Sequence, residues 1–160
     1  MNPGLFVCYN VLGDIMERIE KQMQFILEID KEKQIKRKTL QSNGKDFEDD
    51  AQHAWHMAIM TLLLSEYANE KIDVLKTISM LLIHDLVEID AGDTYAYDDQ
   101  GLKTQSEREN LAANRIFNLL PEDQAKKVFD LWNEFEERKT PEAKFARVMD
   151  NFQPVMLNAA

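Results

Sequence analysis

Hydrophobic residues recur every three to four positions through most of this chain, a spacing typical of amphipathic helices. One apolar stripe follows residues 11–27 and a second follows 54–67. Further stripes follow 111–120, 128–135 and 145–156. No segment alternates apolar and polar residues as a half-buried strand would, and no internal repeat appears. The pattern therefore predicts an all-α domain.

The most hydrophobic segment is 74–89, where apolar residues fall on nearly every face of a helix. Such a helix is expected to lie buried at the centre of a bundle. It contains His84 next to Asp85, and Glu88 follows on an adjoining face, with Asp93 just beyond the expected helix end. Because an unpaired carboxylate is costly to bury, a cation or a hydrogen-bond network must balance this pair.

Turn and capping signals divide the rest of the chain, so that about six helices are expected around the central one. The pair Asn43-Gly44 is a strong turn signal inside a segment that is interpreted as a connecting loop. Pro121 opens the fifth helix and Thr140 caps the last. Trp55 and Trp132 are expected to be packing anchors.

Composition narrows the classes of partner. The formal net charge is −10, from 29 acidic and 19 basic residues, so neither a nucleic-acid polymer nor an anionic membrane is an expected partner. The single cysteine, Cys8, excludes an internal disulfide and fits a reducing compartment. No run approaches the roughly 18 apolar residues of a membrane span, and the N-terminus lacks the basic flank of a signal peptide. One cytoplasmic domain of 160 residues is expected.

Three histidines carry the candidate chemistry: His53, His56 and His84. A single histidine on a helix is most often structural. Here, however, His84 adjoins Asp85 in an apolar helix, His53 begins a neighbouring helix, and Asp150 lies within another apolar face. Two imidazoles and two carboxylates suit Mn, Fe, Co, Ni or Zn. Spacing alone leaves open whether His53 and Asp150 reach the central helix.

The order of these residues forms a longer series: His53, His84-Asp85-x-x-Glu88, Gly92-Asp93 and a distant Asp150. This series resembles the HD-domain metal-dependent phosphohydrolase superfamily, and within it the 5′-deoxynucleotidase-like branch. The likeness implies a single HD-type helical domain over 1–160, although the first helix, in 1–30, is not covered by it. Members usually continue past the point where this chain stops, so a closing helix is expected beyond Ala160.

The resemblance also implies a role for each matching residue. His53, His84, Asp85 and Asp150 match the positions that hold a catalytic divalent metal, whose identity among Mn, Co, Fe, Ni, Zn and Mg stays open. His56 matches no ligand.

The remaining matches surround that metal. Glu88 matches a catalytic acid beside the metal-bound water, and Asp93 one that contacts the nucleotide sugar. Together with Thr94, these two acids match a second cation site. Arg37 falls where family members place an arginine on the substrate phosphate. The chain departs from the usual pattern at Lys38, where tryptophan is common, so base recognition carries over less securely.

The leading hypothesis is a phosphomonoesterase that hydrolyses deoxyribonucleoside 5′-monophosphates to nucleoside and phosphate. A second hypothesis keeps the metal but changes the substrate to another phosphorylated metabolite or a nucleotide second messenger. A third is a helical interaction module that binds metal or ligand without turnover. The apolar faces of the first helix and of the helix around Trp132 would also suit a homodimer.

Overall fold

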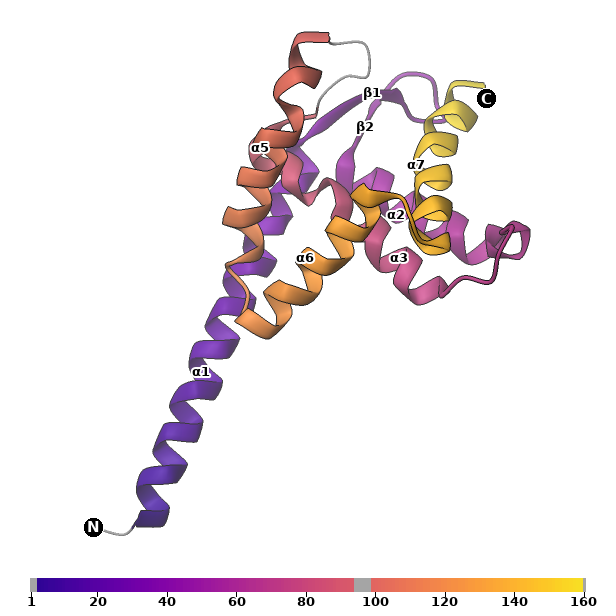
Figure 1. The fold of residues 1–160 in the computed structure, drawn as a ribbon. Coiled ribbons are helices and arrows are strands. Elements are labelled where there is room, and N and C mark those ends of the chain that lie inside the picture. Colours follow the sequence, from indigo (N-terminus) through magenta and orange to yellow (C-terminus); the bar gives the residue numbers. More distant parts are fainter. Residues whose placement is uncertain (1–2, 94–98, 160) are drawn as a thin grey trace.

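The structure, a computed structural model, describes residues 3–93 and 99–159, and the side chains of 13–93 and 103–159 (Figure 1). Within these residues six helices have ten residues or more, and α4 is a single turn. The helices are α1 (Pro3–Ile29), α2 (Asp50–Leu64), α3 (Val74–Ile83), α4 (Glu88–Ala91), α5 (Asp99–Phe117), α6 (Glu122–Glu137) and α7 (Pro141–Ala159). Short 3-10 segments are η1 (Asp30–Gln34), η2 (Ser65–Tyr67) and η3 (His84–Val87). The predicted all-α class is confirmed.

The segment that was expected to be a loop before α2 forms a β-hairpin instead. Strand β1 (Lys36–Leu40) pairs antiparallel with β2 (Phe47–Asp49), with an irregular register between the two ends. The turn signal was correct, since Gly44 has a φ of 65° and Asn43 accepts two backbone hydrogen bonds. The strands were missed because the inward positions of β1 include Arg37, so its burial alternates while its hydrophobicity does not.

The central helix is interrupted where the sequence predicted continuity. Helix α3 ends at Ile83, and η3 and α4 complete the segment. The ring nitrogen Nδ1 of His84 lies 3.0 Å from the carbonyl oxygen of Leu81, which in an α-helix would accept the N–H of Asp85. Because a 3-10 turn has about three residues, Asp85 and Glu88 are brought to the same side.

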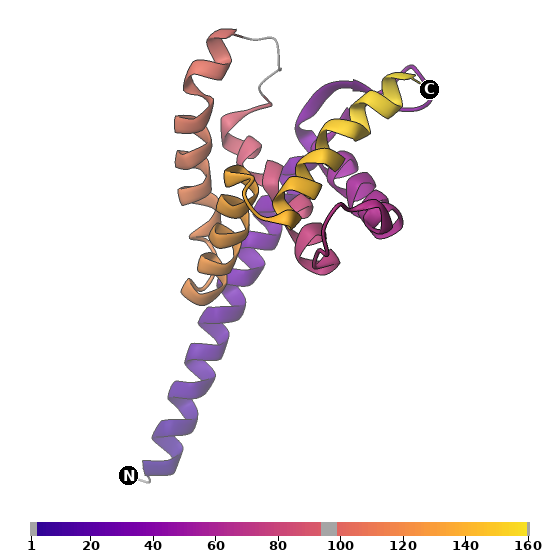
Figure 2. The same ribbon diagram turned by 45° about the vertical axis from the view of Figure 1, so that its right-hand side comes forward.

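The core lies around α3, which packs against α2, α6 and α7 (Figure 2). One buried cluster joins these four helices through residues such as Met57, Met80 and Phe135. A second joins η3, α5 and α6, and it includes the expected anchor Trp132. The expectation for Trp55 was wrong, because its side chain is 63% exposed.

Helix α1 extends away from the rest of the molecule (Figures 1 and 2). Its C-terminal half is attached through an ion pair between Arg18 and Asp123 at 2.7 Å and through Phe25 and Ile29, which pack on the second cluster. Among the described residues no helix is both long and apolar enough to cross a bilayer.

Candidate metal centre

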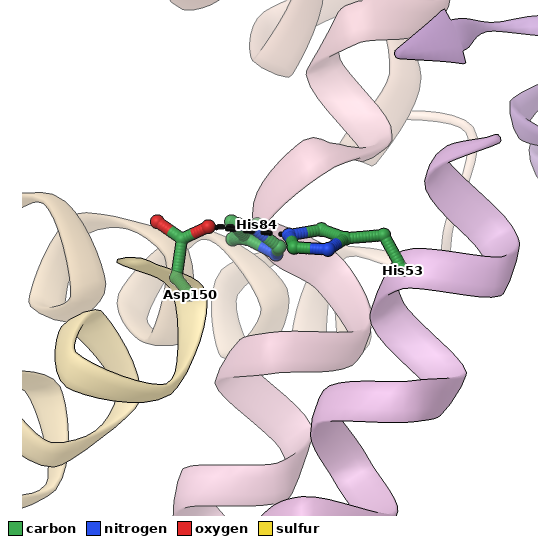
Figure 3. A group of neighbouring side chains, drawn as sticks. All are labelled: His53, His84 and Asp150. Carbon is green, nitrogen blue, oxygen red and sulfur yellow. Dashed lines mark hydrogen bonds and ion pairs between the residues drawn. The ribbon is translucent and has the colours of Figure 1, made fainter. Parts of the chain in front are cut away.

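Three helical segments bring predicted metal ligands to one point. His53 lies in the first turn of α2, His84 begins η3, and Asp150 lies midway along α7 (Figure 3). All three are buried, and one donor atom of each lies within 4.8 Å of the other two. The Oδ1 atom of Asp150 is 3.2 Å from Nε2 of His53 and 3.8 Å from Nε2 of His84.

The other nitrogen of each imidazole explains why the Nε2 atoms face this point. Nδ1 of His53 lies 3.0 Å from Oε1 of Gln153, and Nδ1 of His84 lies 3.0 Å from the Leu81 carbonyl oxygen. Gln153 is held in this orientation because its amide nitrogen donates to Glu48 at 2.6 Å. Since a carbonyl oxygen only accepts, a neutral imidazole keeps its hydrogen on Nδ1 and presents a lone pair at Nε2.

One atom at this point directly favours a metal. Nε2 of His84 is buried and makes no hydrogen bond among the described residues, although carboxylate oxygens of Asp85 and Asp150 lie 3.1 and 3.8 Å from it. A buried nitrogen lone pair that faces carboxylate oxygens is unfavourable unless a cation or a proton lies between them. The donor set of two imidazole nitrogens and a carboxylate therefore fits a divalent cation.

Asp85, the fourth predicted ligand, lies just outside the close set. Its Oδ1 is 3.1 Å from Nε2 of His84, but its Oδ2 accepts a hydrogen bond from Nη1 of Arg37 at 2.8 Å. In the metal-free protein burial lowers the pKa of His53 and His84, but the neighbouring acids outweigh burial and raise both values. Burial likewise raises the pKa of the carboxyls of Asp85 and Asp150, but the protonated imidazoles outweigh it and hold both pKa values below the usual range. Both groups are thus ionised, as metal ligands must be.

Arg37 is engaged by carboxylates rather than free in solvent. Besides Asp85, its Nη1 atom donates to Oδ1 of Asp50 at 3.1 Å, and Asp50 is completely buried. Burial alone would lower the pKa of Arg37, but the two carboxylates raise it further above its ordinary value. The guanidinium is therefore a permanent, partly buried cation between two acids.

The sequence from 29 to 160 matches the family model of the HD domain. The chain belongs to the HD domain family. It is 31% identical over 140 residues to the 5′-deoxynucleotidase HDDC2 of Dictyostelium discoideum, covering 84% of this chain and 74% of that one. It is also 29% identical over 104 residues to the 5′-deoxynucleotidase HDDC2 of Homo sapiens, covering 65% of this chain. The chain spans only 50% of that human relative.

A solved structure agrees with this assignment. The predicted metal-dependent phosphohydrolase of Magnetospirillum magnetotacticum MS-1 is 48% identical and superposes with a TM-score of 0.84. The likeness covers 89% of this chain and 71% of that one. HD phosphohydrolases are metal-dependent, and this HD domain has a His/Asp cluster that suits a metal.

A cavity of about 740 Å³ opens onto this centre of the HD domain. It is lined by the predicted site residues Arg37, Asp85, Glu88, Asp93 and Asp150, among others. Burial, followed by the charges of neighbouring acids, raises the pKa of Glu88 to about 11, and burial also raises that of Asp93. Thr94, the remaining predicted site residue, lies outside the described residues.

Sequence reasoning missed several residues that shape this HD centre. Gln153 orients His53, Asp50 holds Arg37, and Nη1 of Arg147 donates to Asp150 at 2.7 Å. Two signals were available for Gln153 and Arg147, since each lies three residues from Asp150 and so shares its helix face. Asp50 gave only a weaker signal. An acidic residue in the first turn of a helix is usually interpreted as stabilising the helix N-terminus.

A buried acid in η1 gives the HD domain a testable pH dependence. Burial, followed by the charges of Asp85 and Asp50, raises the pKa of Glu32 to about 7 from an ordinary 4.5. The folded state therefore holds a proton that the unfolded chain releases, so stability is complete below pH 4.5 and declines as the pH rises through 7. We expect Glu32→Gln to raise the free energy of unfolding of the metal-free protein at pH 8 by about 1–3 kcal/mol.

Urea unfolding at pH 5 and pH 8 would measure this effect. The control is Glu20→Gln on the exposed surface of α1, which should leave the free energy of unfolding unchanged at both pH values. An equal effect of Glu32→Gln at both pH values would contradict the assignment of the titration to Glu32.

Proposed function

We propose that this HD domain is a metal-dependent phosphomonoesterase for small nucleotides, with deoxyribonucleoside 5′-monophosphates as its main substrates. The observation that carries the proposal is the convergence of two oriented histidines and Asp150 at the base of a cavity that also contains Arg37. The names of the relatives in Dictyostelium discoideum and Homo sapiens support the nucleotide substrate.

His53, His84, Asp85 and Asp150 would hold the cation. When bound, a divalent cation supplies Lewis acidity toward a phosphoryl oxygen and lowers the pKa of water toward ~7. The cation also allows a protein with a net charge of −10 to accept an anionic substrate. Mn, Fe, Co, Ni and Zn all suit this donor set, so the metal that is bound in the cell depends on which of them is available.

Arg37 would orient the phosphoryl group. Its Nη1 atom is occupied by Asp50 and Asp85, whereas its buried Nε atom has no hydrogen-bond partner among the described residues. A guanidinium anchored at one nitrogen presents its other donors in a defined direction. Arg37 therefore positions a phosphoryl oxygen next to the cation with little loss of side-chain entropy on binding.

Glu88 would act as the general acid. Burial, followed by the charges of neighbouring acids, raises the pKa of its carboxyl group, which favours the protonated form. A carboxylic acid in the cavity can donate that proton to the leaving sugar oxygen. Asp93, which lines the same cavity, would accept a hydrogen bond from a sugar hydroxyl, and Thr94 would assist it.

Phosphate release from a panel of substrates tests the proposal. With Mn²⁺ or Co²⁺, we expect hydrolysis of deoxyribonucleoside 5′-monophosphates and none of diesters. Glu88→Gln should lower kcat by about 10²–10⁴-fold while the bound metal is retained, because proton transfer is lost and the cluster of His53, His84 and Asp150 is intact.

Glu137→Gln, on the exposed side of α6, is the control, and its kcat and metal content should equal those of the wild type. Activity restricted to diesters or triphosphates would favour another HD hydrolase reaction. Metal binding without any turnover would favour an interaction module.

A further inference from the structure

Arg138, at the end of α6, has an unusual backbone. Its φ is 55° and its ψ is 30°, and no other non-glycine residue in the described part of the chain has a positive φ. A helix commonly ends in this left-handed conformation, but with glycine, because a Cβ atom is disfavoured there. The chain therefore keeps an arginine where glycine would relieve strain, which suggests that the side chain has a use.

The position of Arg138 indicates what that use is. Four basic residues line the cavity above the metal centre. Arg37 and Arg147 donate to carboxylates of the centre, and the charge of Lys38 acts on Asp93. In the described part of the chain the side chain of Arg138 has no hydrogen bond and no ion pair, so of the three cavity arginines it is the one not held by a carboxylate.

The neighbour of Arg138 in the sequence behaves differently. Lys139 does not line the cavity, and it forms an ion pair with Glu137 at 3.1 Å. An acidic partner is therefore present on this turn, yet Arg138 does not pair with it. Arg138 is exposed in the cavity wall and available to an anion from solution.

We propose that Arg138 forms a distal subsite that binds a second anionic group of the substrate. This inference rests on the proposed phosphomonoesterase function and specifies its substrate class: nucleotides with two separate phosphate groups. The scissile phosphoryl group lies at the metal centre beside Arg37, which enters from β1. The second phosphate meets Arg138, which enters from the connection between α6 and α7.

The size and chemistry of the cavity support this assignment. Its volume of about 740 Å³ falls in the range of sites that enclose a whole small ligand and not just one phosphate. A guanidinium binds phosphate oxygens through two parallel hydrogen bonds, which an ammonium group cannot do. Glu109, on α5, also lines the cavity and repels an anion from that side, whereas Glu136 lies on α6 near Arg138 and sets a cost that the guanidinium must offset.

The test compares deoxyadenosine 5′-monophosphate with deoxyadenosine 3′,5′-bisphosphate at a fixed concentration of free Mn²⁺. For the wild type we expect KM for loss of the 5′-phosphate to be about three- to fivefold lower with the bisphosphate at low salt, and the difference to shrink at high salt. Arg138→Gln should abolish the difference, and the control Lys139→Gln should preserve it. Equal KM values in the wild type, or a preference that survives in Arg138→Gln, would overturn the proposal.

Arg138→Gly separates binding from a structural role. Because it removes the strain of a Cβ atom, it should raise Tm by about 2 °C while it abolishes the preference for the bisphosphate. A raised Tm with an unchanged preference would show that Arg138 has no part in binding. Should the wild type hydrolyse neither compound, the proposed function fails, and calorimetric binding of the same two nucleotides still decides the role of Arg138.

Discussion

Asp150→Asn is expected to yield a folded protein that retains almost no divalent metal and loses at least about 10³-fold in phosphatase activity. The single oxygen Oδ1 of Asp150 lies 3.2 Å from Nε2 of His53 and 3.8 Å from Nε2 of His84, so it joins the two imidazoles in one donor set. An amide in its place keeps the shape of the side chain but removes the negative charge that binds the cation.

Metal analysis of the purified variant measures this directly, with circular dichroism to confirm the helical fold. The matched control is Asp130→Asn on the exposed side of α6, where the carboxylate pairs only with Lys126 at 2.7 Å. That variant should bind metal like the wild type. Stoichiometric metal in Asp150→Asn would show that the three buried residues are not the metal site.

The second large effect is expected from Arg37→Met, which should destabilise the metal-free protein by about 3–5 kcal/mol. Arg37 donates to Asp50 at 3.1 Å and to Asp85 at 2.8 Å, and its loss would leave one buried and one partly buried carboxylate without their cation. These acids can escape the penalty by taking up protons, because burial already raises the pKa of Asp50 to about 7. The destabilisation should therefore be larger at pH 8 than at pH 5.

Urea unfolding at the two pH values provides the measurement. Lys36→Met is the control, because Lys36 is the preceding residue of β1 and forms only a 3.4 Å pair with Asp49; we expect a change below about 1 kcal/mol. Adding Asp50→Asn to Arg37→Met should restore part of the lost stability, since one uncompensated charge is removed. Wild-type stability of Arg37→Met would mean that the carboxylates are balanced by other groups.

Several features of the fold could be predicted because they depend on neighbours in the sequence. The period of the apolar residues indicated the helices, and the pair Asn43-Gly44 indicated a turn. The strands on either side of that turn were missed, since β1 directs a charged side chain inward. The end of α3 was missed for a similar reason: the bond of His84 to Leu81 replaces a helical one, and periodicity does not report such competition.

The candidate site divides in the same way. Motif spacing and resemblance indicated His53, His84, Asp85 and Asp150 as ligands, and the structure gathers them, although their metal-binding role stays a prediction. Neither signal indicated that Arg37 is held by Asp50. An arginine within a basic stretch is interpreted as a surface residue unless the acidic residue that pairs with it is known.

By itself, then, the sequence determined the helical class, the family resemblance and the residue types able to bind a metal, because these follow from short-range patterns. Only the tertiary structure decided which nitrogen of His53 faces the centre, because that depends on Gln153, which lies 100 residues away in the chain. It also decided that Arg37 is already paired while Arg138 is not. Pairing of buried charges is set by distances across the fold, which local patterns do not encode.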